Sequence, residues 1–208
     1  MPETCPPVTL AGQSLAALAD ALSLRTLPPV ERWNPTHCGQ SDMVIRRDGS
    51  WTYRGDPITR PAMIRLFASV LRREPDGSHV LVTPAEKLSI EVEATAFRAV
   101  AMSSEGSGES RSIALELDHA DALIVGLAHP LTVIDTPAGP SPRVLVRHGL
   151  EAILSRSLYY ELADIALGEG HDPAGICPTA PSSRSLPPRP QWHDARHPPH
   201  QRARPPGS

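Results

Sequence analysis

The stretch Thr83-Pro84-Ala85-Glu86-Lys87-Leu88-Ser89-Ile90-Glu91-Val92-Glu93 combines a turn sequence with a short strand that is flanked by charged residues. Its first part, Thr-Pro-x-Glu-Lys, is typical of a turn between two strands, because proline and threonine favour tight turns. Its centre, residues 88–90, has the composition of a strand. Strand-like segments also lie on either side, at residues 79–83 and 97–102. The stretch therefore predicts consecutive strands joined by short turns.

The segment before this stretch has the pattern of a hairpin followed by a helix. Residues 43–47 and 50–54 are strand-like, and Asp48-Gly49 between them supplies the positive φ angles of a tight turn. Thr59-Arg60-Pro61 is typical of a helix start, and apolar residues recur at helical spacing over residues 63–71. We expect this helix to cover the hairpin and Trp51 to lie in the core.

The second part of the chain repeats the same general order of elements. Residues 113–117, 122–125, 132–134 and 143–147 are strand-like, and apolar residues over 150–167 indicate one or two helices. Strands followed by a helix thus occur twice, which we interpret as a structural duplication without a sequence repeat. A shorter amphipathic helix is expected after Ser14. Its apolar face can dock on a partner or on the body of the protein, and we favour the body.

We expect an α+β fold with a compact body made of two related halves. The predicted divisions are an N-terminal segment (1–26), an N-terminal half (27–103), a C-terminal half (104–170) and a tail (171–208). The tail is rich in proline, arginine, histidine and serine, so we expect it to be disordered. Pro187-Pro188-Arg189-Pro190 also has the pattern of a proline-rich ligand, which leaves a scaffold function open against an uninvolved tail.

Composition excludes several classes of function. The chain has 208 residues, a formal net charge of -3 and an isoelectric point near 6.3, so it lacks the basic excess of nucleic-acid-binding proteins. No apolar run approaches the roughly 20 residues that span a bilayer. The three cysteines are an odd number without a C-x-x-C pair. We therefore expect a cytoplasmic protein with no disulfide framework, metal or cofactor, and no nucleic-acid or membrane partner.

Several motifs together resemble one known family. They are Arg32-Trp33-Asn34-Pro35-Thr36-His37-Cys38-Gly39, Asp48-Gly49-Ser50-Trp51-Thr52-Tyr53, Arg60-Pro61 with its following helix, and Thr83-Pro84-Ala85-Glu86-Lys87. Over residues 27–167 the chain resembles the domain of unknown function 1285 family, whose members are mainly proteobacterial. The resemblance implies a cytoplasmic α+β fold of repeated motifs, no established activity and a suggested part in signalling. One departure is Glu93-Ala94-Thr95-Ala96-Phe97, where relatives usually have Glu-Asp-Ala-Pro-Phe.

The charged residues of the opening stretch are the main candidate site. Glu86, Lys87, Glu91 and Glu93 are predicted to form a charged cluster, with Thr83 in the adjoining turn, in which Lys87 binds an anion. The alternative, which we favour, is a structural turn with surface ion pairs.

Two residues outside the stretch are further candidates. Trp33 lies in a proline-flanked loop from which it can line a pocket. Arg60 belongs to a set of arginines that gives the N-terminal half a local basic bias toward an acidic ligand or partner. His119 and His129 lack helical ligand spacing, so no metal site is predicted there.

No catalytic constellation is recognisable in the sequence. We therefore expect a ligand-sensing or protein-interaction module with an unknown small molecule or protein as its partner. The family resemblance implies a part in signal transduction. The alternative is a small-molecule enzyme that draws its acid and base from Glu86, Lys87, Glu91 and Glu93. A catalytic group should lie in a concave, desolvated cleft, whereas an interaction surface should be open.

Overall fold

The computed structural model describes residues 7–10, 12, 14–137 and 139–169. These residues form two six-stranded sheets with three α-helices and two short 3-10 helices. The expected disorder of residues 171–208, the proline-rich ligand pattern and the first six residues lie outside the described part. The prediction of an α+β body with two halves is confirmed, although strands outnumber helices.

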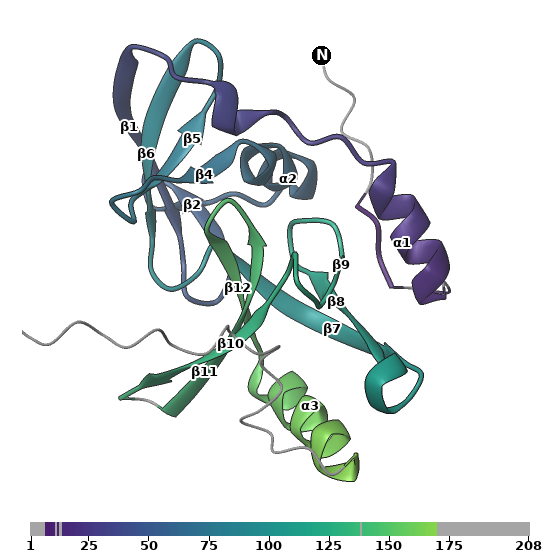
Figure 1. Cartoon of the computed structure of the whole chain (residues 1–208). Coiled ribbons are helices and arrows are strands. Elements are labelled where there is room, and N and C mark those ends of the chain that lie inside the picture. The colour runs from purple at the N-terminus through teal and green to yellow at the C-terminus, as the bar shows by residue number, and fades with distance from the viewer. Residues whose placement is uncertain (1–6, 11, 13, 138, 170–208) are drawn as a thin grey trace, which may run out of the picture.

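The first sheet has the strand order β3-β2-β1-β6-β5-β4. Its strands are β1 (His37–Ile45), β2 (Trp51–Tyr53), β3 (Asp56–Pro57), β4 (Leu71–Arg73), β5 (His79–Val82) and β6 (Glu86–Val92). The first and last strands, β1 and β6, pair in parallel, and the other described pairs are antiparallel. Helix α2 (Pro61–Ser69) connects β3 to β4 and lies beside this sheet (Figure 1).

The second sheet has the order β10-β11-β12-β7-β8-β9. Its strands are β7 (Phe97–Glu105), β8 (Ser112–Leu117), β9 (Leu123–Ile124), β10 (Leu131–Thr136), β11 (Gly139–Arg147) and β12 (Leu150–Leu154). Here too the first and last strands, β7 and β12, pair in parallel. Counted from its own first strand, each sheet therefore has the same strand order. The change of sheet lies between β6 and β7, and the expected boundary at residues 103 and 104 falls inside β7.

The β1–β2 hairpin forms as the sequence predicts. Gly49 has a φ of 86°, and the Asp48 carboxylate accepts hydrogen bonds from the backbone N–H and the hydroxyl of Ser50. Helix α2 begins with Pro61 in its first turn, and the Phe67 ring stacks on Trp51 at 6.4 Å between centroids. The helix thus covers the hairpin, as expected from its apolar spacing.

Two predicted helix ranges are wrong. Helix α2 ends at Ser69, so Leu71 belongs to β4, where it pairs with Leu81 of β5. Residues 150–154 form the strand β12 and not part of a helix. Leu150, Ala152 and Leu154 are buried while the residues between them are half-buried, which is the period of a strand. Helix α3 (Arg156–Gly168) begins only after Ser155, whose hydroxyl caps it by accepting from the backbone N–H of Leu158.

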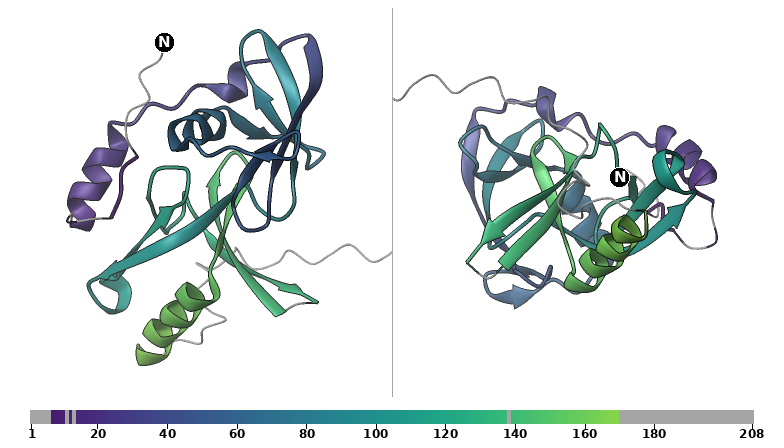
Figure 2. Two further views of the ribbon diagram at one scale, coloured as in Figure 1. Left: turned by 180° about the vertical axis from the view of Figure 1, so that it is seen from behind. Right: turned by 60° about the horizontal axis from the view of Figure 1, so that its bottom comes forward.

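The N-terminal helix α1 (Leu15–Ser23) docks on the body of the protein, as favoured from the sequence, and the surface it covers belongs to the second half. Ser14 caps it, and Leu15 and Leu18 pack with Ala114 and Ala122 of the second half. The chain then leaves α1 and runs across to the first sheet through η1 (Val30–Arg32) (Figure 2). The chain from α1 through η1 to Trp33 therefore contacts both halves.

One hydrophobic core joins the two halves. It contains buried residues of the first half, such as Trp51 and Leu71, together with buried residues of the second, such as Leu115 and Leu150. Side-chain to backbone hydrogen bonds also cross between the halves, from Arg73 to Gly149 and from Arg98 to Asp48. The two sheets are thus packed as one body. The second 3-10 helix, η2 (Gly108–Ser110), lies in the β7–β8 loop.

Candidate functional site

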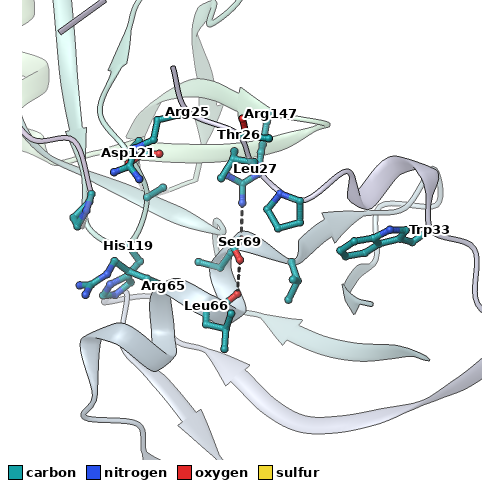
Figure 3. A pocket seen from close by; sticks show the side chains of 15 residues that line it. Arg25, Thr26, Leu27, Trp33, Arg65, Leu66, Ser69, His119, Asp121 and Arg147 are labelled. Carbon is teal, nitrogen blue, oxygen red and sulfur yellow. Dashed lines mark hydrogen bonds and ion pairs between the residues drawn. The ribbon is translucent and has the colours of Figure 1, made fainter. Parts of the chain in front are cut away.

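A cavity of about 410 Å³ lies where the two halves meet the N-terminal segment (Figure 3). Three groups of residues line it. The segment after α1 contributes Arg25, Thr26, Leu27, Pro28 and Trp33. Helix α2 and the residue after it contribute Arg65, Leu66, Ala68, Ser69 and Val70. The second half contributes His119, Ala120, Asp121 and Arg147. Pro7 completes the lining. The volume is within the range of small-molecule sites.

Residues 25–33, which we call the strap, form one wall of the cavity and are held at both ends. At one end Arg25 forms an ion pair of 3.0 Å with Asp121 of the second half. At the other end the guanidinium of Arg72, on β4, donates to the carbonyls of Val30 at 2.7 Å and Trp33 at 2.8 Å. The strap is therefore attached to both halves on either side of the cavity.

Arg147, at the end of β11, reaches the cavity from the second half. Its Nη2 donates to the Ala68 carbonyl of α2 at 2.6 Å, and its Cζ lies 5.5 Å from the centroid of the Phe97 ring. Its Nε is buried and has no hydrogen-bond acceptor among the described residues. Burial lowers the pKa of this guanidinium, because desolvation disfavours the charged form, while Asp121 acts in the opposite direction.

Arg65 reaches the cavity from the first half, on α2. Its Nε is also buried without an acceptor. The side chain of Arg65 makes no hydrogen bond or ion pair with another residue in the described part of the chain. In Figure 3 Arg65 and His119 lie at one side of the cavity, and Trp33 lies at the opposite side. The cavity thus has a polar end and an apolar end.

The loop between β8 and β9 supplies the polar groups beside Arg65. The Nε2 of His119 lies 3.2 Å from the Gly49 carbonyl, and Asp121 accepts from the backbone N–H of Val8 in addition to its ion pair with Arg25. Next to the lining, Asp118 accepts from two backbone N–H groups. Burial raises the pKa of the Asp118 carboxyl, and the charge of His119 opposes this shift.

The turn at the start of the predicted charged site has a structural role. The Thr83 hydroxyl accepts from the backbone N–H groups of Ala85 at 3.3 Å and Glu86 at 3.1 Å, and the Thr83 N–H donates to the Glu86 carbonyl at 2.9 Å. Thr83 and Glu86 therefore close the β5–β6 turn. This geometry fits the structural alternative that the sequence also allowed.

The charged side chains after this turn lie in different places and have different partners. Lys87 Nζ lies 3.9 Å from a carboxylate oxygen of Glu74. Glu91 lines a second cavity, beside β1. Glu93 accepts from Arg46 at 2.8 Å and from the backbone N–H of Arg47 at 2.9 Å, and lines a third cavity. The hydrogen bond from Arg46 lowers the pKa of the Glu93 carboxyl. These side chains do not converge on one cavity.

Of the predicted site residues, Trp33 lines the cavity between the halves. Arg60 is exposed at the N-cap of α2 and makes no side-chain capping bond. Sequence reasoning missed Arg147 and Asp121 as site residues, set His119 aside, and placed Arg65 only in a general basic bias. These residues come from three segments that meet through tertiary packing, so no local pattern marks them.

The described residues were also compared with the requirements of a metal site and of a membrane-spanning helix. No group of three or more His, Cys, Asp or Glu residues suited to a metal ion is present among the residues that the structure describes. Within the same ranges, none of the helices has the length and apolar character needed to cross a bilayer.

Comparison with known proteins identifies the family. Residues 28–95 match the model of the N-terminal domain of DUF1285, a domain of unknown function, and residues 96–177 match the model of the DUF1285 C-terminal domain. The chain belongs to the DUF1285 family. The predicted family resemblance is thereby confirmed, and the two family models divide the chain where the structure changes from β6 to β7.

Two solved structures of DUF1285 proteins are similar to this chain. A DUF1285 family protein from Silicibacter pomeroyi DSS-3 is 40% identical, with 74% of this chain and 85% of that chain covered and a TM-score of 0.63. A DUF1285 family protein from Shewanella baltica OS155 is 24% identical, with coverage of 59% and 90% and a TM-score of 0.46. No curated protein matches this chain.

Proposed function

We propose that this protein is a ligand-sensing module that binds a small molecule in the cavity between its two halves. The observation that carries the proposal is the shared lining: the strap, α2 of the first half and the β8–β9 loop of the second half all contribute side chains. A ligand there contacts all three parts at once. Binding therefore stabilises the strap in its contact with both halves, and such a ligand-dependent preference for one state is the physical requirement for a sensor.

A binding role is supported over catalysis by the state of the polar groups in the lining. Asp121 is engaged by Arg25 and by the backbone of Val8, and His119 is engaged by the Gly49 carbonyl. Asp121 is therefore not left as an unpaired acid or base for proton transfer, and His119 has one ring nitrogen engaged. The enzyme alternative at residues 83–93 gains no support, because its side chains do not converge on one cavity. The cysteine content favours a cytoplasmic location for the sensor.

A thermal-shift screen of the full chain against metabolites, nucleotides and organic acids tests the proposal. A ligand at about 100 times its dissociation constant stabilises the fold by roughly 2.7 kcal/mol, which is readily measured. Thr26→Trp places a bulky side chain in the strap wall of the cavity and should abolish the shift. Thr132→Trp, at an exposed position on β10 away from the cavity, is the matched control and should retain it.

Two results would contradict the proposal. One is a screen in which no compound stabilises the wild-type chain. The other is a stabilising compound whose effect is the same in wild type, Thr26→Trp and Thr132→Trp, because its site would then lie elsewhere.

A further inference from the structure

The cavity between the halves holds more positive than negative charge. Its lining contains three arginines, Arg25, Arg65 and Arg147, and one carboxylate, Asp121. Arg25 and Asp121 form an ion pair at 3.0 Å, so this pair is neutral overall. Arg65 and Arg147 form no ion pair within the described residues. The chain as a whole has a formal net charge of -3, so this excess of cations is a local feature of the cavity.

Arg147 is a half-buried cation that forms no ion pair within the described residues. Its close neighbours are a backbone carbonyl, that of Ala68, and the face of the Phe97 ring. Neither carries a full negative charge, and the Nε–H still lacks an acceptor. Burying a charge without a charged partner is unfavourable, and so is burying a donor without an acceptor. An oxyanion next to this guanidinium would offset both costs.

Arg65, in the first half, is likewise a cation whose charge and buried donor have no partner in the described part of the chain. Its Nε is buried without an acceptor, and it has no carboxylate partner among the described residues. Arg65 stands on α2 and Arg147 on β11, so the two uncompensated cations face one cavity from opposite halves. Arginine is the side chain best suited to bind carboxylate and phosphate groups, since its planar guanidinium offers parallel donors.

Much of the remaining lining is apolar. Leu27, Pro28 and Trp33 contribute apolar surface from the strap, and Leu66 and Val70 contribute it from the first half. Trp33 lies across the cavity from Arg65 (Figure 3). A ligand that fills this space therefore needs a hydrocarbon or aromatic body as well as an anionic group.

We propose that the ligand is an oxyanion with an apolar body, a carboxylate or a phosphate monoester, whose anionic group lies between Arg65 and Arg147 while its body extends toward Trp33. This inference rests on the proposed sensing function and specifies its ligand. It also gives the anion a mechanical role, since one ligand group would neutralise a cation from each half and hold the halves together.

Isothermal titration of the full chain with matched probes tests the inference. The probes are 4-phenylbutyrate, its uncharged counterpart 4-phenylbutanamide, and phenyl phosphate. At least one of the two anions should bind, and the amide should bind at least about tenfold more weakly than 4-phenylbutyrate if the carboxylate is the preferred head group. Tighter binding of phenyl phosphate would instead assign the site to phosphate monoesters.

Arginine variants show whether the anion lies where we propose. Arg147→Met and Arg65→Met should each weaken binding by about tenfold or more, because each removes a charged donor. Arg143→Met, on the same strand as Arg147, and Arg60→Met, at the start of the helix that carries Arg65, are the controls outside the cavity and should change affinity less than about twofold. If Arg147→Met does not fold, Arg147→Lys, which keeps the charge and loses the planar fork, takes its place.

The inference is overturned if neither anion binds, if the amide binds as tightly as both anions, or if the Arg65 and Arg147 variants bind like their controls. These failures differ from failure of the sensing function itself. A neutral compound that stabilises wild type but not Thr26→Trp would preserve a sensor at this cavity and remove only its anion specificity.

Discussion

At the scale of single residues, the contact between the halves depends on Gly49. Its φ of 86° suits glycine, and a Cβ built at this position would lie 2.8 Å from the Asp118 carboxylate and 2.9 Å from Arg98 Cδ. The turn residue that makes the hairpin is therefore also the point where the hairpin fits against the second half. Glycine is required there for both its backbone and its lack of a side chain.

Gly49→Ala should lower the free energy of unfolding by roughly 2 kcal/mol or more, because backbone strain adds to the displacement of Asp118 and Arg98. Gly55→Ala is the matched control: Gly55 has a φ of 91°, but a Cβ there meets nothing within 4 Å. It should cost only the strain, on the order of 1 kcal/mol. Urea denaturation measures the loss in the free energy of unfolding for each variant. Equal losses would show that Gly49 has no special packing role.

The buried carboxyl of Asp118 should make stability depend on pH. Its pKa is raised from the ordinary value of 3.8, chiefly by burial, so the folded state keeps the proton to a higher pH than the unfolded state. Between 3.8 and the raised pKa, the folded state binds more protons, and the free energy of unfolding contributed by this group falls as pH rises.

Asp118→Asn should remove this decrease in the free energy of unfolding, because an amide does not ionise. The amide oxygen can still accept from the backbone N–H groups of Arg98 and His119. The stability of the variant relative to wild type should therefore increase as pH rises from about 4 and then level off. Urea denaturation of both proteins from about pH 4 to about pH 8 measures the difference. A relative stability that decreases over this range would mean that the Asp118 pKa is lowered.

At the scale of elements, the sequence predicts correctly those helices and hairpins whose ends carry turn or capping residues. The Asp48-Gly49 turn, Pro61 at the start of α2 and the Ser14 cap of α1 are all formed as expected. Strand β12 was mistaken for helix because its apolar residues fit both periods, and pairing with β7 decides the outcome. Such pairing is between residues more than 50 positions apart, so it has no local signal.

The strap depends on one side chain of a neighbouring element. Arg72→Met removes two hydrogen bonds to its backbone, at Val30 and Trp33. Amide hydrogen exchange across residues 25–33 should become faster by about tenfold or more, since each charged hydrogen bond contributes on the order of 1.5 kcal/mol or more. Arg32→Met, an exposed position in the strap itself, should leave the exchange rates unchanged. Similar exchange in both variants would mean that the strap is held by other contacts.

At the scale of the whole molecule, the shared core makes the halves depend on each other for stability. The two sheets have the same strand order, yet their buried residues form one cluster. The candidate site is a product of this packing: Arg65, His119 and Arg147 are brought together by three separate segments. The sequence therefore predicted the family and the two halves, and among the residues of the cavity it singled out Trp33 alone.

Because the core is shared, the halves should unfold in one cooperative transition. Leu115 is 1% exposed and belongs to the second half, and Leu115→Ala should cost roughly 2–5 kcal/mol while leaving a single calorimetric peak. Differential scanning calorimetry of wild type and variant provides the comparison of calorimetric and van't Hoff enthalpies. Two separated peaks in the variant would show that each half has an independent core.

The central claim, that the cavity between the halves is the ligand site, is tested most directly by a crystal structure of the full chain soaked with 4-phenylbutyrate. We predict that the carboxylate lies between Arg65 and Arg147 and that the phenyl ring lies toward Trp33. A ligand bound instead at residues 83–93, with the cavity between the halves left empty, would contradict the claim.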